Sequence, residues 1–151
     1  MPGSVKAQLG FANAAYYPVA GNPYGVAVAD FNGDGIQDIV AAHPQQNSVS
    51  ILLGIGNGTF TSVSVLDTNR SGLSSSYSQR SIASGDFNGD GKSDIVVTEF
   101  AINSVSVYFG NGDGTFQYDT TYLIPTSNST YGTGPNEVLI GDMNGDGLPD
   151  I

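Results

Sequence analysis

Short runs of β-branched and aromatic residues alternate with small or polar residues along most of the chain, and clusters of Gly, Asn, Asp and Ser separate these runs. Alternation with a period of two residues is typical of half-buried β-strands, and the Gly-rich clusters are typical of turns. The pattern predicts two sets of four strands, at residues 25–29, 38–42, 48–53 and 61–66, and again at residues 81–85, 94–98, 104–109 and 117–123. It also predicts one earlier strand, at residues 14–20.

The two sets of strands belong to one repeated unit of 56 residues. The segment SVSILLG at residues 48–54 aligns with SVSVYFG at residues 104–110, and Gly-Thr-Phe at residues 58–60 aligns with Gly-Thr-Phe at residues 114–116. Four antiparallel strands in a unit of this length are typical of a propeller blade. We therefore predict an all-β fold built from four-stranded antiparallel β-propeller blades.

The repeat divides the chain into a single array of four parts. We expect an N-terminal strand of a preceding or shared blade at residues 1–23, repeat 1 at residues 24–79, repeat 2 at residues 80–135 and the start of repeat 3 at residues 136–151. A propeller closes with roughly four to eight blades, so the ring is expected to be incomplete within one chain. Two explanations stay open. The sequence is a fragment of a longer propeller, or several chains form a homo-oligomer in which the N-terminal strand of one chain completes the last blade of the next.

A nine-residue acidic motif, Asp-x-Asn-Gly-Asp-Gly-x-x-Asp, begins at Asp30, Asp86 and Asp142. Side-chain oxygens stand at positions 1, 3, 5 and 9 of the motif, and the backbone carbonyl at position 7 can add a fifth oxygen. An all-oxygen set with three carboxylates suits Ca²⁺, whereas Mg²⁺ demands a tighter octahedron. Zinc is disfavoured because the motif contains no His or Cys.

We therefore predict about three structural Ca²⁺ ions per chain, one in each loop. The predicted ligands are Asp30, Asn32, Asp34, the Ile36 carbonyl and Asp38 in the first loop, Asp86, Asn88, Asp90, the Lys92 carbonyl and Asp94 in the second, and Asp142, Asn144, Asp146, the Leu148 carbonyl and Asp150 in the third. A hairpin turn is one alternative, because Asn-Gly and Asp-Gly favour turns, but a turn needs no aspartate at both position 1 and position 9. An EF-hand is another, but it needs a Glu at position 12, where this chain has Ala41 or Val97.

The motif Asp-Phe-Asn-Gly-Asp-Gly-x-x-Asp-Ile-Val, followed by a Leu-Gly or Phe-Gly step, resembles the FG-GAP/VCBS repeats of integrin-α-like β-propellers. The resemblance covers most of residues 20–151. It implies that the loop aspartates bind calcium and that the blades circle a central channel. It also implies a role in adhesion, or in carbohydrate or protein binding, outside the cell.

The charge of the chain fits metal binding better than a general anionic surface. The chain has 14 acidic and 4 basic residues and a net charge of −10, and nine of the acidic residues lie in the three motifs. Three Ca²⁺ ions would reduce the formal charge to −4, since each ion carries two positive charges. This acidity argues against nucleic acid or anionic membrane as a partner. No apolar run approaches the roughly 20 residues of a membrane span. Because the chain has no cysteine and so no disulfide, we expect the bound metal to stabilise the fold instead.

Other residue types give weaker indications of function. His43 is the only histidine, and no Gly-x-Ser-x-Gly nucleophile elbow accompanies it, so we interpret it as a surface or strand-end residue rather than as part of a catalytic triad. The eight tyrosines are mainly expected to be strand residues. Tyr77 and Tyr131, between the repeats, are candidates for ligand contact. No catalytic residue is predicted.

The expected function is that of a non-enzymatic, calcium-stabilised module for recognition or adhesion. Its partner would be a protein or a glycan, without membrane insertion. We expect a location that is extracellular, at the cell surface or periplasmic, because calcium sites of about 10⁻⁴ to 10⁻³ M affinity are typical of extracellular modules. Two alternatives stay open: a lectin with sugar sites between blades, and an accessory domain of a larger secreted enzyme.

Overall fold

A computed structural model describes residues 15–68, 79–125 and 134–151. The strands are β1 (Gly25–Ala29), β2 (Asp38–His43), β3 (Ser48–Gly54), β4 (Phe60–Asp67), β5 (Gln79–Gly85), β6 (Asp94–Glu99), β7 (Ser104–Gly110) and β8 (Phe116–Leu123), with a short 3₁₀ helix, η1 (Phe100–Ile102), before β7. The eight strands predicted from the two repeats are therefore confirmed, and each predicted boundary lies within two residues of the observed one. Within the described residues, no helix is long and apolar enough to cross a bilayer.

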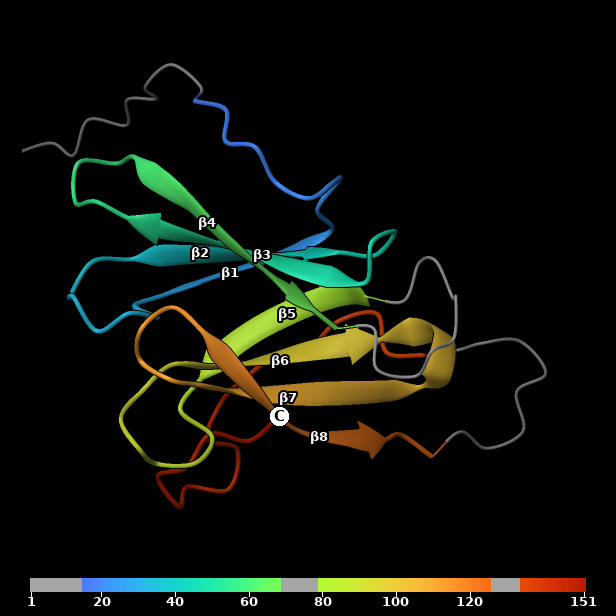
Figure 1. The fold of residues 1–151 in the computed structure, drawn as a ribbon. Coiled ribbons are helices and arrows are strands. Elements are labelled where there is room, and N and C mark those ends of the chain that lie inside the picture. Colours follow the sequence, from blue (N-terminus) through green and yellow to red (C-terminus); the bar gives the residue numbers. More distant parts are fainter. Residues whose placement is uncertain (1–14, 69–78, 126–133) are drawn as a thin grey trace, which may run out of the picture.

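The strands form two antiparallel four-stranded sheets, in the orders β1-β2-β3-β4 and β5-β6-β7-β8. Figure 1 shows the two sheets stacked on each other, with β5 in contact with β1 and β2. Both sheets have the same irregularity of register, between Ile51 and Leu52 in β3 and between Val107 and Tyr108 in β7. Bulges of this kind increase strand twist, and these two lie one repeat apart. The structure thus confirms the all-β fold of propeller-like blades, which do not close into a ring over the residues described.

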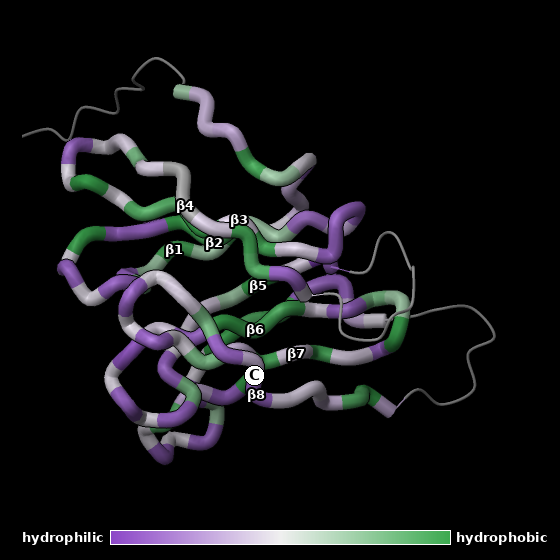
Figure 2. The backbone as a smooth tube through the Cα atoms, viewed as in Figure 1, coloured by the Kyte–Doolittle hydropathy of each residue, from purple (hydrophilic) through white to green (hydrophobic). Residues whose placement is uncertain are grey.

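The main core lies between the two blades. Successive residues of a strand point to opposite faces of its sheet, so each blade offers alternate residues to its neighbour. The first blade contributes Val40, Ala42, Val49 and Ile51, and the second contributes Ile82, Ile95, Val97 and Tyr108. The middle strands of both sheets are apolar along most of their length, whereas the connecting loops are hydrophilic (Figure 2). Stacking of blades, rather than a single sheet, therefore supplies the hydrophobic stabilisation.

The start of the third repeat covers the opposite face of the second blade. Val138 packs with Val96, Val105 and Val107 in a second buried cluster. Two backbone hydrogen bonds, of 3.1 and 2.8 Å, join Gly141 and Asp150 and begin the next strand pair. The third repeat thus packs on the second blade as the second packs on the first.

The strand predicted at residues 14–20 is not formed over its described part, residues 15–20, which have no regular secondary structure. This segment lies against the outer face of the first blade. The Ala20 N–H donates to Ser50 Oγ (3.2 Å), and the Tyr17 hydroxyl accepts a hydrogen bond from the Phe60 N–H (3.3 Å). Tyr17 and Phe60 also pack edge to face, with 5.5 Å between ring centroids. Side chains rather than a neighbouring strand therefore hold the segment, so no ladder forms.

Candidate metal centres

The three acidic motifs form loops of the same shape at the same place in each repeat. The first joins β1 to β2, the second joins β5 to β6, and the third lies between Gly141 and Asp150. Positions 4 and 6 adopt positive φ in every copy, for example 77° at Gly33 and 81° at Gly35. Glycine occupies these positions because only glycine reaches this conformation at little cost. In Figure 1 the acidic loops and the β3–β4 and β7–β8 turns lie at the same end of the blades.

The aspartate at position 1 organises each loop by accepting the amides that follow it. Asp30 Oδ1 accepts the N–H groups of Gly33 (2.7 Å) and Asp34 (3.2 Å), and Asp30 Oδ2 accepts the Gly35 N–H (2.8 Å). The same three bonds recur around Asp86 and Asp142. The Gly35 amide is the main cause of the lowered pKa of Asp30, and the Gly147 amide acts likewise on the pKa of Asp142. Both carboxylates are therefore ionised at neutral pH.

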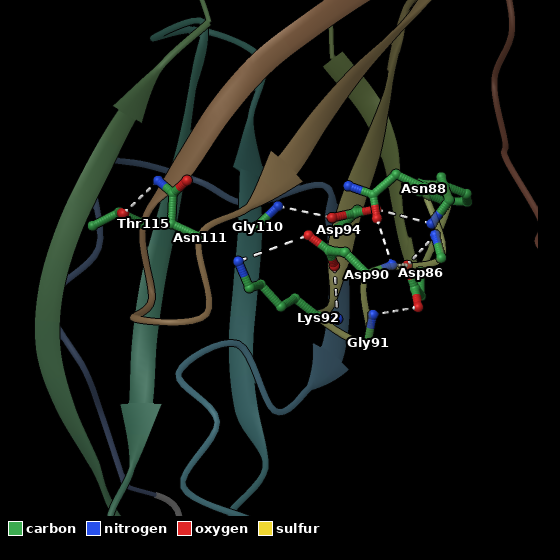
Figure 3. A network of polar contacts seen from close by, with 11 residues as sticks. Asp86, Asn88, Asp90, Gly91, Lys92, Asp94, Gly110, Asn111 and Thr115 are labelled. Atoms are coloured by element: carbon green, nitrogen blue, oxygen red, sulfur yellow. Dashed lines mark hydrogen bonds and ion pairs between the residues drawn. The ribbon is translucent and has the colours of Figure 1, made fainter.

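Positions 3 and 5 continue this network along the loop. The Asn32 side-chain oxygen accepts the Asp34 N–H (3.0 Å), and Asp34 Oδ1 accepts the Ile36 N–H (2.8 Å). The equivalent bonds are present in the second and third loops. The second loop also contains an ion pair, in which Lys92 Nζ lies 3.7 Å from Asp90 Oδ2 (Figure 3). This ion pair is exposed and therefore weak.

Position 9 has a structural role that the sequence did not reveal. Asp38 is fully buried, and its two oxygens accept the N–H groups of Phe31 (2.8 Å) and Gly54 (2.8 Å). Asp94 does the same with Phe87 and Gly110, both at 2.8 Å. Each of these aspartates therefore ties its loop to the end of the third strand of its blade. In the third loop, Asp150 accepts the Met143 N–H (2.8 Å).

The glycine that ends the third strand of both blades could have indicated this role of position 9 from the sequence. Gly54 and Gly110 end the segments SVSILLG and SVSVYFG, which align at the repeat offset. A methyl group at Gly54 would collide with the Gln37 carbonyl oxygen, and one at Gly110 would collide with the Ser93 carbonyl oxygen. Glycine thus lets the strand end approach the residue before the buried aspartate.

The carboxylates of one loop repel one another. Burial is the main cause of the raised pKa of Asp94, the amides of Gly110 and Phe87 oppose it, and the negative charges of Asp90 and Asp86 add to it. Figure 3 shows these three carboxylates in the second loop. A bound cation would remove this repulsion, as opposite charge favours the ionised form.

The donor set of each loop fits a calcium ion in its chemistry. It consists of three carboxylates, one amide oxygen and one carbonyl, all hard oxygen donors, and an oxygen that accepts one N–H keeps a lone pair for an ion. In the described conformation, positions 1, 3 and 5 share the loop amides, whereas position 9 lies at the base of the loop. No three carboxylate or histidine side chains among the described residues come close enough together to form a ready-made metal centre. Calcium binding thus stays a prediction.

His43 is buried, so its interpretation as a surface residue is wrong, although it does end β2. Its Nε2 lies 2.8 Å from Ser50 Oγ, and burial lowers the pKa of the imidazole. The equivalent residue of the second blade is Glu99, which accepts the hydroxyl protons of Ser104 (3.3 Å) and Ser106 (2.9 Å). The His43 site is therefore one of two buried polar pairs at equivalent positions. The ligand candidates Tyr77 and Tyr131 lie outside the described residues.

Comparison with known proteins agrees with the repeat described above. A model of the FG-GAP-like repeat matches residues 30–97 and again residues 86–151. Each match begins at the first aspartate of a loop, and together they span the chain from Asp30 onwards. Comparison with curated proteins gives no match. Since the two matches cover well over half of its residues, the chain belongs to the FG-GAP-like repeat family.

Proposed function

We propose that the three acidic loops bind calcium and that the chain is a calcium-stabilised propeller module for recognition outside the cell. One observation supports the metal most directly: each described loop concentrates three carboxylates, and in the second loop burial, with smaller contributions from the charges of Asp90 and Asp86, raises the pKa of Asp94. Nine such groups in three loops repel one another unless cations are bound.

The residues that would hold each ion are those at positions 1, 3, 5, 7 and 9 of the motif. The ion supplies positive charge that neutralises the carboxylates, while the loop amides already orient positions 1, 3 and 5. Binding would pin the connection between the first two strands of a blade. Because the unfolded chain has no such preformed site, the free energy of binding adds to the free energy of folding.

Thermal unfolding in millimolar CaCl₂ against EDTA tests the proposal. Ligand at 100 times its Kd adds about 2.7 kcal/mol per site, so we expect a large rise in Tm with calcium and about three ions per chain by titration calorimetry. MgCl₂ at the same concentration is the control, because Mg²⁺ prefers a tighter octahedral site. An unchanged Tm with no heat of binding would show that the loops are only turns.

The proposed partner is a protein or a glycan, and the proposed location is extracellular, at the cell surface or periplasmic. The family and the recurrent acidic loops support a non-catalytic recognition or adhesion module. A glycan array probed with the calcium-loaded chain distinguishes the two partner classes. Binding to a defined sugar would favour a lectin, and a blank array would favour a protein partner.

A further inference from the structure

The first acidic loop makes direct contact with the second blade. The Phe31 carbonyl oxygen accepts a hydrogen bond from the Gly114 N–H (2.9 Å) in the β7–β8 turn. The Phe31 side chain is 1% exposed and packs edge to face on Phe116, with 5.5 Å between ring centroids. The β7–β8 turn of the second blade is therefore seated on the loop of the first.

The fit between this loop and this turn is close. A methyl group added at Gly33, position 4 of the first loop, would lie 3.5 Å from the Gly112 carbonyl oxygen. A methyl group added at Gly114 would lie 3.1 Å from Leu53 Cδ2, near the end of β3. The turn thus fills the space between the first loop and β3, and a displacement of the loop is transmitted to it.

The peptide groups of Phe31 connect this contact to the predicted ligands. Phe31 stands between Asp30 and Asn32 in the chain, and its N–H donates to Asp38 Oδ2 (2.8 Å). The Phe31 carbonyl oxygen, in turn, accepts the hydrogen bond from the Gly114 N–H. An ion that holds Asp30 and Asp38 would therefore also hold the carbonyl on which the second blade docks.

The other two loops have the same internal hydrogen bonds without this neighbour. Phe87, at position 2 of the second loop, is only partly buried, and no backbone N–H in the described part of the chain donates to its carbonyl oxygen. Met143, at position 2 of the third loop, is 71% exposed. The three loops thus share the hydrogen bonds that their backbone amides donate, and they differ most in their surroundings.

We propose that the first loop couples calcium binding to the docking of the second blade on the first. Calcium in this loop tightens the contact between Phe31 and the β7–β8 turn, and the docked turn in return raises the affinity of the loop for calcium, since coupling between two binding events is reciprocal. Calcium in the second loop acts within its own blade. This inference rests on the proposed function, because it needs calcium to bind.

Hydrogen exchange of the Gly114 amide tests the coupling from the calcium side. Exchange is compared in CaCl₂ and in EDTA for the parent chain, for Asp34→Asn in the first loop and for Asp90→Asn at the equivalent position of the second. We expect calcium to slow exchange about tenfold in the parent chain and in Asp90→Asn, and to leave it unchanged in Asp34→Asn. Equal slowing in Asp34→Asn would overturn the coupling.

Calcium titration of two matched variants tests the coupling from the blade side. Phe116→Ala removes the ring that packs on Phe31, and Phe60→Ala removes the equivalent ring of the first blade, which packs on Tyr17 instead. We expect Phe116→Ala to weaken one site about tenfold and Phe60→Ala to weaken none. Phe116→Leu serves in the same way if the alanine variant does not fold.

The two proposals fail in distinguishable ways. If the parent chain binds calcium and Phe116→Ala binds it with the same affinities, the coupling is wrong and the calcium sites stand. If the parent chain gives no heat of binding with calcium, the proposed function fails and the coupling fails with it.

Discussion

At the scale of single residues, the aspartates at positions 5 and 9 of the first loop have different roles. Asp34 accepts an exposed amide of its own loop, whereas Asp38 is buried and accepts two amides from separate segments. The motif indicated both residues as ligands, because ligand spacing carries no information about burial. The fold adds to Asp38 a function that does not depend on an ion.

We therefore expect Asp38→Ala to destabilise the protein even in EDTA. The substitution leaves the N–H groups of Phe31 and Gly54 without their acceptor, and each buried unsatisfied amide costs about 1–3 kcal/mol. Asp34→Ala should cost much less in EDTA and should lose mainly the stabilisation that calcium provides. Urea unfolding with and without calcium measures both. Equal stabilities of the two variants in EDTA would contradict the assignment.

His43 predicts a pH dependence of stability. Burial lowers the pKa of the folded imidazole below its ordinary value of 6.5, so the unfolded chain binds more protons than the folded chain in the window between the two values. Stability therefore falls as the pH decreases through this window. We expect Tm to decrease as the pH falls below 6.5. His43→Gln should show a smaller decrease, and an equal decrease would exclude His43 as the cause.

At the scale of elements, alternation was sufficient to predict the eight strands of the two blades. It failed at residues 15–20, the described part of the strand predicted at residues 14–20, where the Ala20 N–H donates to the Ser50 side chain rather than to a strand partner. For His43 the place at the end of β2 was predicted correctly, but its burial was not, because a polar residue is expected at the surface and its partner, Ser50, comes from the neighbouring strand. The local sequence thus predicted the strands, whereas contacts between segments distant in sequence could be identified only from the structure.

The end of the third strand is expected to be sensitive to substitution, because it contacts a segment distant in sequence. A methyl group at Gly54 meets the Gln37 carbonyl oxygen and would displace the amide that Asp38 accepts. Gly54→Ala should therefore cost about 1–3 kcal/mol from overpacking alone. Gly141→Ala is the matched control, because no atom lies within 4 Å of a methyl group there. Chemical denaturation of both variants measures the difference, and a comparable loss in the control would refute the steric explanation.

At the scale of the whole molecule, the third repeat presents an apolar surface. Leu139, Met143, Leu148 and Ile151 are between 49% and 71% exposed. Leu139, Met143 and Ile151 also line a hollow of about 700 Å³ beside Tyr122 and Val105 of the second blade. Contiguous exposed apolar surface of this kind favours association.

We expect the 151-residue chain to associate with itself as its concentration rises, through this surface. Leu139→Glu, which places a charge on the surface away from the interface between the two blades, should shift the equilibrium towards monomer. Sedimentation or light scattering over a range of concentrations measures the change. A compact monomer at all concentrations would contradict the expectation.

The third loop, finally, has a consequence for the order in which the chain folds. It keeps the same internal hydrogen bonds as the other two, although the described residues give it only a single bridge, between Gly141 and Asp150, in place of a full strand pair. The conformation of such a loop depends on hydrogen bonds between residues near in sequence rather than on a complete sheet. Loops of about ten residues close in roughly 10–100 ns. We expect the acidic loops to form early and to set the register of the strands that they join. Asp86→Asn should then slow refolding in stopped-flow experiments more than it speeds unfolding.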